Sequence, residues 1–204
     1  AINSEATPQV KAWLLSRKAA FQHTLDAAGA QATLLAAYKL EPGVTKPMQG
    51  AAYKKLSPST GQQAANLMSN HQARFLDATQ MQLYVGGLCS DLQFSQGTSN
   101  KFEAAVNSLA WFLGINGQRP EKDYNEGPDN LWALPNGKFL VIECKNEVTS
   151  DAGVSKKDAG QLGQSMAWFD ARYPASEGVP IMIHPDTKLG QGATLVAGMR
   201  IIDH

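Results

Sequence analysis

Two apolar segments around a tight turn constrain the fold of this chain more than any other feature. Leu131–Leu134 and Lys138–Lys145 are separated by Pro135-Asn136-Gly137. Short β-prone runs divided by a proline- and glycine-containing turn predict a β-hairpin. The geometry of that hairpin decides which polar side chains near its ends can meet.

The register of the predicted hairpin brings two acids together. If the loop has three residues with Gly137 in the left-handed region, Leu134 lies opposite Lys138. Counting outward from that pair, Asp129 falls opposite Glu143. Directly opposed residues have Cβ atoms about 5 Å apart, close enough for two carboxylates to share one cation. A two-residue turn would instead place Asp129 on the other face of the hairpin.

Side-chain alternation assigns the neighbours of Glu143 to two faces of its strand. Lys145 lies on the same face as Glu143, and Cys144 points the other way, toward the core. A carboxylate that ends so apolar a strand carries a desolvation cost unless a metal ion or another partner satisfies it. The pattern therefore predicts a functional site here. The alternative for Lys145 is a structural salt bridge to Glu143 or Glu147.

Composition narrows the class of protein. Of 204 residues, 43% are hydrophobic, and 18 basic residues balance 18 acidic ones. The chain is therefore not disordered, and no global positive field indicates nucleic-acid binding. Two cysteines are too few for a disulfide scaffold. Because apolar runs are short and no secretory signal is evident, we expect a cytoplasmic protein without membrane association. The start without methionine and the end just after Ile202 suggest part of a larger protein.

Periodicity and helix breakers divide the chain into an α-helical part, residues 1–95, and an α/β part, residues 96–204. In the helical part we expect helices over residues 8–40, where Gly29 can separate two of them, and over residues 62–84, ended by Gly86-Gly87. In the α/β part we expect, in chain order, a helix at 99–113, strands at 118–124, 131–134 and 138–145, a helix at 156–173, and strands at 179–183 and 195–202. This order is typical of one sheet flanked by helices.

The acids and the lysine of the hairpin suit metal-assisted hydrolysis of a phosphodiester. Two carboxylates and a backbone carbonyl can hold Mg²⁺, which polarises the phosphate and helps to deprotonate water, while a nearby ammonium stabilises developing charge. An acid-x-Lys triplet alone is a weak signal, since chance gives roughly one match in such a chain. Pro185-Asp186-Thr187-Lys188 is another match. We interpret that second match as a turn, because no hairpin precedes it.

Residues from about 99 to 202 resemble the PD-(D/E)xK, or restriction-endonuclease-like, superfamily of nucleases. Pro128-Asp129 followed by Glu143-Cys144-Lys145 matches the signature of that family literally. The resemblance implies an α/β fold with a mixed central sheet flanked by helices. It does not extend to the preceding α-helical residues 1–95, whose role it leaves open. The amino-acid sequence around residues 119–132 and 167–169 is most similar to that of nuclease domains attached to bacterial DEAD/DEAH-type helicases.

The resemblance also implies roles for the motif residues. Asp129 and Glu143 would ligate the metal, with the backbone carbonyl of Cys144 assisting. Lys145 would orient or activate the attacking water.

Two flanking helices supply further candidates by resemblance. The core helix of the family often carries an early acid, and Glu103 matches that position. The helix after the motif strand often carries a glutamine, for which Gln161 is the first candidate and Gln164 the second. The Gln-x-x-x-Tyr pattern of RecB-type exonucleases is absent, because Ser165 and Trp168 stand four residues after these glutamines.

The family implies Mg²⁺-dependent cleavage of DNA, with Mn²⁺ as a substitute, RNA as an open alternative substrate, and further domains or a helicase as partners. A rival hypothesis is an inactive module of the same fold that binds nucleic acid or a partner protein. A third hypothesis makes residues 1–95 a docking or oligomerisation element.

Outside the motif, Lys157 can cap a helix or face water. Glu121 is expected at a solvated edge, from which it could also support the site.

Overall fold

The computed structural model describes residues 7–24, 26–47, 53–148 and 153–203. The chain divides into two compact units, one of residues 1–54 with 123–125 and one of residues 55–122 with 126–204. The division that the sequence suggested, between residues 95 and 96, falls inside the second unit. Helices α3 (Gln63–Arg74) and α4 (Ala78–Asp91) group with the α/β part because both contact α5 (Ser99–Phe112).

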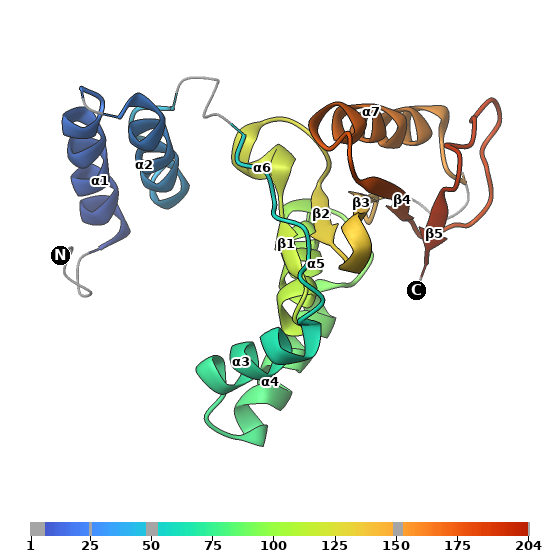
Figure 1. Ribbon diagram of the computed structural model, residues 1–204, viewed down its shortest axis with the longest axis horizontal. Coiled ribbons are helices and arrows are strands. Elements are labelled where there is room, and N and C mark those ends of the chain that lie inside the picture. Colours follow the sequence, from blue (N-terminus) through green and yellow to red (C-terminus); the bar gives the residue numbers. More distant parts are fainter. Residues whose placement is uncertain (1–6, 25, 48–52, 149–152, 204) are drawn as a thin grey trace. The chain divides into compact units, whose positions relative to one another are not determined.

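The first unit contains a pair of adjacent helices, α1 (Pro8–Gln22) and α2 (Ala27–Leu40) (Figure 1). Small side chains let two helix backbones approach closely, and the buried residues of this pair are Ala12, Ala19, Ala30 and Ala37. The expected break at Gly29 is wrong, since this residue lies in the first turn of α2. Asp26 begins that helix instead, because its carboxylate accepts a hydrogen bond of 2.9 Å from the Gly29 N–H.

Helices α3 and α4 replace the single helix expected over residues 62–84. The chain leaves the helical conformation at Phe75, and Asp77 caps α4 by accepting a hydrogen bond of 2.8 Å from the Gln80 N–H. Gly86-Gly87 does not end a helix, because both glycines lie inside α4.

Within the residues described, no helix is both long and apolar enough to cross a membrane.

A polar stripe on α3 holds the carboxyl end of α5. The last carbonyls of a helix have no partner within it. Side chains spaced along one face of α3 donate to these and the following carbonyls: Asn70 to Trp111 at 2.8 Å, His71 Nε2 to Phe112 at 2.9 Å, Gln63 to Leu113 at 3.0 Å and Asn66 to Gly114 at 3.3 Å. This contact fixes the position of α3 relative to the helix that packs on the sheet.

The sheet has five strands in the order β1-β2-β3-β4-β5. They are β1 (Asn116–Gln118), β2 (Asn130–Ala133), β3 (Lys138–Cys144), β4 (Glu177–Ile183) and β5 (Arg200–Ile202). The first three pair antiparallel and the last three parallel, so the sheet is mixed. The strand expected at 118–124 is wrong beyond Gln118, because Pro120 begins a short helix, α6 (Pro120–Tyr124). The last strand is shorter than the predicted 195–202.

The predicted hairpin register is confirmed. The pairs Asn130↔Ile142, Leu131↔Val141, Trp132↔Leu140 and Ala133↔Phe139 form as counted from the sequence. Leu134 N–H donates to the Lys138 carbonyl at 2.8 Å, and a 3₁₀ turn, η1 (Pro135–Gly137), closes the loop. Gly137 has a φ of +70°, as the three-residue loop requires.

Two helices cover opposite faces of the sheet, and an apolar cluster lies between each helix and the sheet (Figure 1). Residues of α5 pack with one face in a cluster of Phe102, Val106, Ala110, Trp132, Ile142, Cys144 and Ile181. Helix α7 (Lys156–Arg172) covers the other face, where Leu162 and Ala159 pack with Met182 and Val154. Phe139 contacts Phe169 on this side, with ring centroids 5.4 Å apart; burying each ring contributes roughly 1.5–3 kcal/mol. Both helices match their predicted ranges within one residue.

We predict that Gly114→Ala destabilises the second unit more than Gly97→Ala does. Both glycines have a φ of +72°, so an alanine at either position meets a similar backbone cost of about 1–2 kcal/mol. A Cβ at residue 114 would clash with the backbone of Gln63 and Leu67, whereas one at residue 97 would have no atom within 4 Å. We expect Gly114→Ala to lower the free energy of unfolding by about 1–3 kcal/mol more. Urea unfolding measures the difference, and equal costs would contradict the docking of α3 on α5.

Candidate active site

The carboxyl end of β3 and the residue before β2 bring the two predicted acids together. Glu143 pairs with Met182 of β4 and lies on the face of the sheet that α7 covers. Asp129 directly precedes the Asn130↔Ile142 pair, and its Oδ2 accepts a hydrogen bond of 2.7 Å from the Cys144 N–H. The carboxylate of Asp129 thus continues the pairing of β2 with β3 and lies at the level of Glu143.

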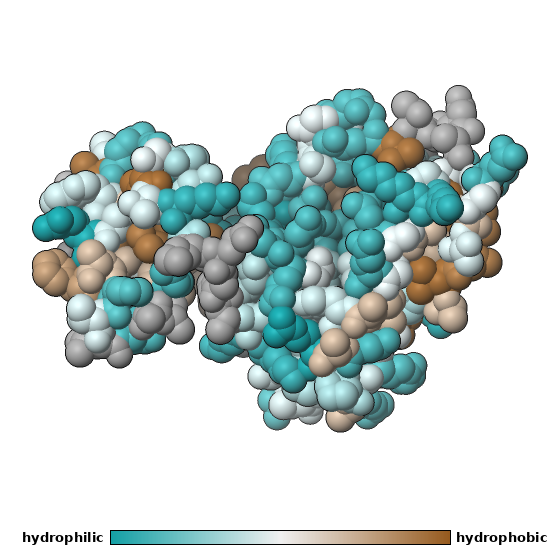
Figure 2. Space-filling view, turned by 90° about the horizontal axis from the view of Figure 1, so that it is seen from above, coloured by the Kyte–Doolittle hydropathy of each residue, from teal (hydrophilic) through white to brown (hydrophobic). Residues whose placement is uncertain are grey.

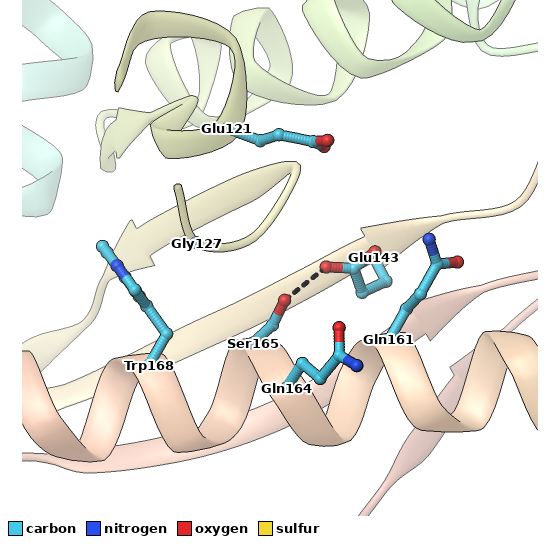
Figure 3. Close-up of a pocket in the computed structure, with 7 residues that line it drawn as sticks. All are labelled: Glu121, Gly127, Glu143, Gln161, Gln164, Ser165 and Trp168. Atoms are coloured by element: carbon cyan, nitrogen blue, oxygen red, sulfur yellow. Dashed lines mark hydrogen bonds between the residues drawn. The ribbon is translucent and has the colours of Figure 1, made fainter. Parts of the chain in front are cut away.

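Glu143 holds its carboxylate in a nearly solvent-free position, with 5% of the residue exposed. Its Oε1 accepts a hydrogen bond of 2.6 Å from Ser165 Oγ on α7 (Figure 3), and its Oε2 lies 3.4 Å from Lys145 Nζ. Burial, and next the charge of Asp129, raise the pKa of Glu143 to about 7, against the opposing effects of Ser165 and Lys145. The ionisation of Glu143 therefore responds to small changes in local charge near neutral pH.

Lys145 lies on the same face as Glu143, as alternation predicted. Burial lowers the pKa of Lys145, but the charges of Glu143, Asp129 and Asp158 outweigh burial and raise the pKa above its usual value. The side chain is therefore an ammonium at neutral pH. The structural salt bridge to Glu143 that the sequence offered as an alternative is present, at 3.4 Å.

A polar cleft of about 290 Å³ opens beside Glu143. In Figure 3, Glu121 reaches into it from α6, while the other side is formed by α7. The residues of α7 that line the cleft recur at intervals of three or four and so share one face of the helix: Gln161, Gln164, Ser165 and Trp168. Both glutamines singled out by resemblance therefore lie beside Glu143, together with Ser165, which the sequence did not single out as a site residue.

Glu121 takes part in the site although the residue is exposed. Hydrogen bonding to Asp129, followed by burial and the charges of Asp129 and Glu143, raises the pKa of Glu121 to about 7. A hydrogen bond between two carboxyl groups needs a proton on one of them. Glu121 is exposed, as a solvated edge predicts, and it also interacts with Asp129, as the supporting role that the sequence left open would require.

Glu103 of α5 lies close enough to Asp129 for their charges to interact, and it is paired with Arg119. Burial, and next the charge of Asp129, raise the pKa of Glu103, while Arg119 opposes the shift. The guanidinium of Arg119 donates to the Glu103 carboxylate and lies 3.1 Å from the Asn100 side-chain oxygen. The side-chain amide of Asn130 donates to the Glu103 carbonyl at 3.1 Å, which links α5 to the start of β2.

Cys144 points to the opposite side of β3, as predicted. The residue is 6% exposed, and it belongs to the apolar cluster under α5. Burial raises the pKa of the Cys144 thiol well above its usual value. Only the backbone of Cys144 faces the acids, and its N–H already binds Asp129.

The second acid-x-Lys match forms a turn, as the sequence indicated. Asp186 Oδ1 accepts a hydrogen bond of 2.9 Å from the Lys188 N–H, and the Asp186 N–H donates to His184 Nδ1 at 2.9 Å. His184 is fully buried. These residues shape the loop after β4 and lie outside the polar cleft.

Carboxylates suited to a hard cation gather here, although within the described ranges no three His, Cys, Asp or Glu side chains stand in a metal-holding arrangement. Each acid is engaged by another group: Asp129 by the Cys144 N–H, Glu143 by Ser165 and Lys145, and Glu103 by Arg119. Oxygen ligands are those that Mg²⁺ prefers. A divalent cation would also relieve the repulsion that raises the pKa of Glu121 and Glu143. The chemical type of these donors is therefore that of a Mg²⁺ site, although the described residues form no preassembled group of three.

Comparison of the chain with protein-family models, curated proteins and solved structures finds no match. The resemblance to PD-(D/E)xK nucleases thus depends on the residues of this chain: Asp129, Glu143 and Lys145 in the motif, and Glu103 and Gln161 around it. Of these, Glu143 and Gln161 line the cleft. Lys145 pairs with Glu143, Asp129 is bonded to the Cys144 N–H, and Glu103 pairs with Arg119.

We predict that the second unit loses stability as the pH rises from about 5 to 8. Because the folded-state pKa of Glu143 and Glu121 lies above the unfolded value of 4.5, the folded protein binds more protons in this range, and raising the pH favours unfolding. Glu143→Gln removes the ionisable group and should abolish a loss on the order of 2 kcal/mol. Urea unfolding at several pH values measures this.

Glu177→Gln is the matched control, because Glu177 is an exposed partner of Lys138 at the far end of the sheet. It should leave the pH dependence as it is in the unchanged protein. A Glu143→Gln protein with the original pH dependence would contradict the assignment of the raised pKa to Glu143.

Proposed function

We propose that the second unit is a metal-dependent nuclease that hydrolyses phosphodiester bonds in DNA. The observation that carries this proposal is the convergence of Asp129, Glu143 and Lys145 at one end of the hairpin, in the register counted from the sequence. Two acids and an ammonium beside a polar cleft are the groups that this hydrolysis needs.

In this proposal Asp129 and Glu143 hold Mg²⁺, or Mn²⁺ in its place, and the carbonyl of Cys144 adds a ligand. When bound, the ion supplies Lewis-acid polarisation of the phosphate and a lower pKa for water. Asp129 is positioned for this by the Cys144 N–H, and Glu143 by Ser165. Glu143 must release its proton before it ligates a cation, which makes metal binding stronger as the pH rises through about 7.

Lys145 serves as a charged donor in this proposal. An amine with a pKa above its usual value keeps its proton at neutral pH and is a poor general base. An ammonium beside the scissile phosphate stabilises the negative charge that develops on its oxygens and orients the attacking water by hydrogen bonding. Gln161 would hold the same water or a phosphate oxygen from the α7 side of the cleft, and Glu103, paired with Arg119, would support the site as a further acid.

The wider context of the proposal follows the same resemblance. The sheet with α5 on one face and α7 on the other would correspond to the restriction-endonuclease-like core. Attachment to a helicase or to other DNA-processing domains, action in the cytoplasm, and RNA as a second substrate belong to this proposal as well.

We predict that cleavage needs Asp129 and Lys145 and a divalent cation. Supercoiled plasmid and labelled single-stranded DNA are incubated with Mg²⁺, Mn²⁺ or EDTA, and Asp129→Asn and Lys145→Met should each lower the rate at least about 100-fold. Asparagine at 129 can still accept the hydrogen bond from the Cys144 N–H, so the hairpin is kept. A labelled RNA oligonucleotide of the same sequence tests the alternative substrate.

Asp186→Asn and Lys188→Met are the matched controls, because they change the same residue types in the other acid-x-Lys match, away from the cleft. They should cut at the original rate. Cleavage in EDTA, or equal loss in the controls, would refute the assigned centre. If the folded protein cleaves nothing with any of the metals, and Asp129→Asn binds DNA as tightly as the original protein, the inactive binding module would be supported instead.

A further inference from the structure

A groove along α7 continues from the polar cleft. A depression of about 670 Å³ is lined by Lys156, Lys157, Gly160, Gln161 and Gln164. Its last two residues also line the cleft beside Glu143, so the two hollows are neighbours along one helix. Figure 2 looks onto the side of the second unit where α7 lies, and the surface there is mainly hydrophilic.

The charge changes sign along this groove. At one end stand the carboxylates of Glu121 and Glu143, and at the other stand the ammonium groups of Lys156 and Lys157. Both lysines are exposed and occupy the first turn of α7, where positive charge is unfavourable because the helix dipole is positive at its amino end. Among the residues that the structure describes, neither lysine has an ion-pair partner. The acid of the same turn, Asp158, is buried against Ser155, and among the described residues it forms no ion pair with either lysine.

Gly160 leaves the middle of the groove open. A glycine inside a helix costs about 0.5–1 kcal/mol relative to alanine, and a Cβ at this position would meet no atom within 4 Å. Internal packing therefore does not require glycine here. Its effect is to expose the helix backbone between the lysines and the glutamines, so that an extended ligand can approach closely.

A nucleic-acid strand fits these features better than a small anion does. From Ser165 to Lys157 the helix rises about 12 Å, which corresponds to about three or four nucleotides of a strand at 3.4 Å each. The lysines match its phosphates, the glutamine amides can bind phosphate or sugar oxygens, and the bare backbone at Gly160 leaves room for the chain between them. The acids at the other end repel phosphates unless a cation is bound, so the lysines mark the side where the strand is held.

We propose that the groove of Lys156, Lys157, Gly160, Gln161 and Gln164 binds the phosphodiester backbone of the strand on one side of the scissile bond. This inference rests on the proposed function, which it extends from the reacting groups to the path of the substrate. Lys156 and Lys157 are phosphate-binding residues and take no part in the reaction itself.

The test measures binding apart from cleavage. A fluorescein-labelled single-stranded oligonucleotide and the corresponding duplex are titrated with protein in EDTA and in Ca²⁺, at several NaCl concentrations. The double variant Lys156→Ala/Lys157→Ala should weaken binding about tenfold. It should also reduce the slope of log K against log[NaCl] by about 1.4 on the single strand, since each phosphate contact contributes about 0.7. Where the protein cleaves, this variant should raise KM and leave kcat within twofold.

A charge-matched control is Lys101→Ala/Lys138→Ala, because each of these lysines already pairs with an acid, Asp91 and Glu177 respectively. It should bind within twofold of the original protein. Gly160→Leu fills the groove without a change in charge and should also weaken binding, although leucine favours helix over glycine. Gly86→Leu is its control, since this helical glycine in α4 likewise has no atom within 4 Å of its Cβ position.

Lysine-dependent binding by a protein that cuts nothing would support the groove and refute the proposed activity. Cleavage that keeps its KM and salt dependence in Lys156→Ala/Lys157→Ala would refute the groove and keep the activity. Three further outcomes would overturn the inference of a nucleic-acid strand. The double variant could bind the oligonucleotides as tightly as the original protein, or the original protein could bind neither oligonucleotide in either buffer. The original protein could also bind poly-glutamate equally tightly.

Discussion

The hydrogen bond from the Cys144 N–H to the Asp129 carboxylate is the interaction on which the candidate site depends. It extends the pairing of β2 with β3 by a side chain, so the position of one acid is fixed by the backbone that carries the other. A slip of the hairpin by one residue would turn Glu143 and Lys145 to the α5 face and Cys144 to the α7 face. The loop geometry at Pro135–Gly137 therefore sets the chemistry more than 10 Å away, since each residue of a strand spans about 3.3 Å.

The acids of this site are held against their own repulsion by the rest of the second unit. Burial and neighbouring negative charge disfavour ionisation of Glu143, and the ammonium of Lys145 offsets part of that cost. Hydrogen bonding to Asp129 and burial disfavour ionisation of Glu121. The apolar layers on both faces of the sheet supply the stability that makes such a strained arrangement tolerable. A site of this kind is poised to take up positive charge, from a proton at low pH or from a cation at higher pH.

The parts of the structure that follow from local chemistry could be predicted from the sequence. The turn chemistry of the hairpin fixed its register, and strong apolar periodicity located both helices that flank the sheet. The glycines were misleading markers of helix boundaries. Asp26 caps α2, which runs through Gly29, and Asp77 caps α4, which runs through Gly86-Gly87. Ser165 and Arg119 became visible only in three dimensions, since their partners are distant in the chain and no local pattern marks them.

The polar stripe of α3 determines where the smallest independently folding piece of this unit begins. Four side chains of α3 bind backbone carbonyls at and just after the end of α5, and farther upstream the Leu56 N–H donates to the Tyr173 hydroxyl at 2.8 Å, beside the end of α7. A protein shortened to start at residue 96 would return all five of these bonds to water, at both flanking helices at once. The natural starting point for an isolated α/β fragment is therefore near residue 55, some forty residues earlier than the motif-bearing region alone suggests.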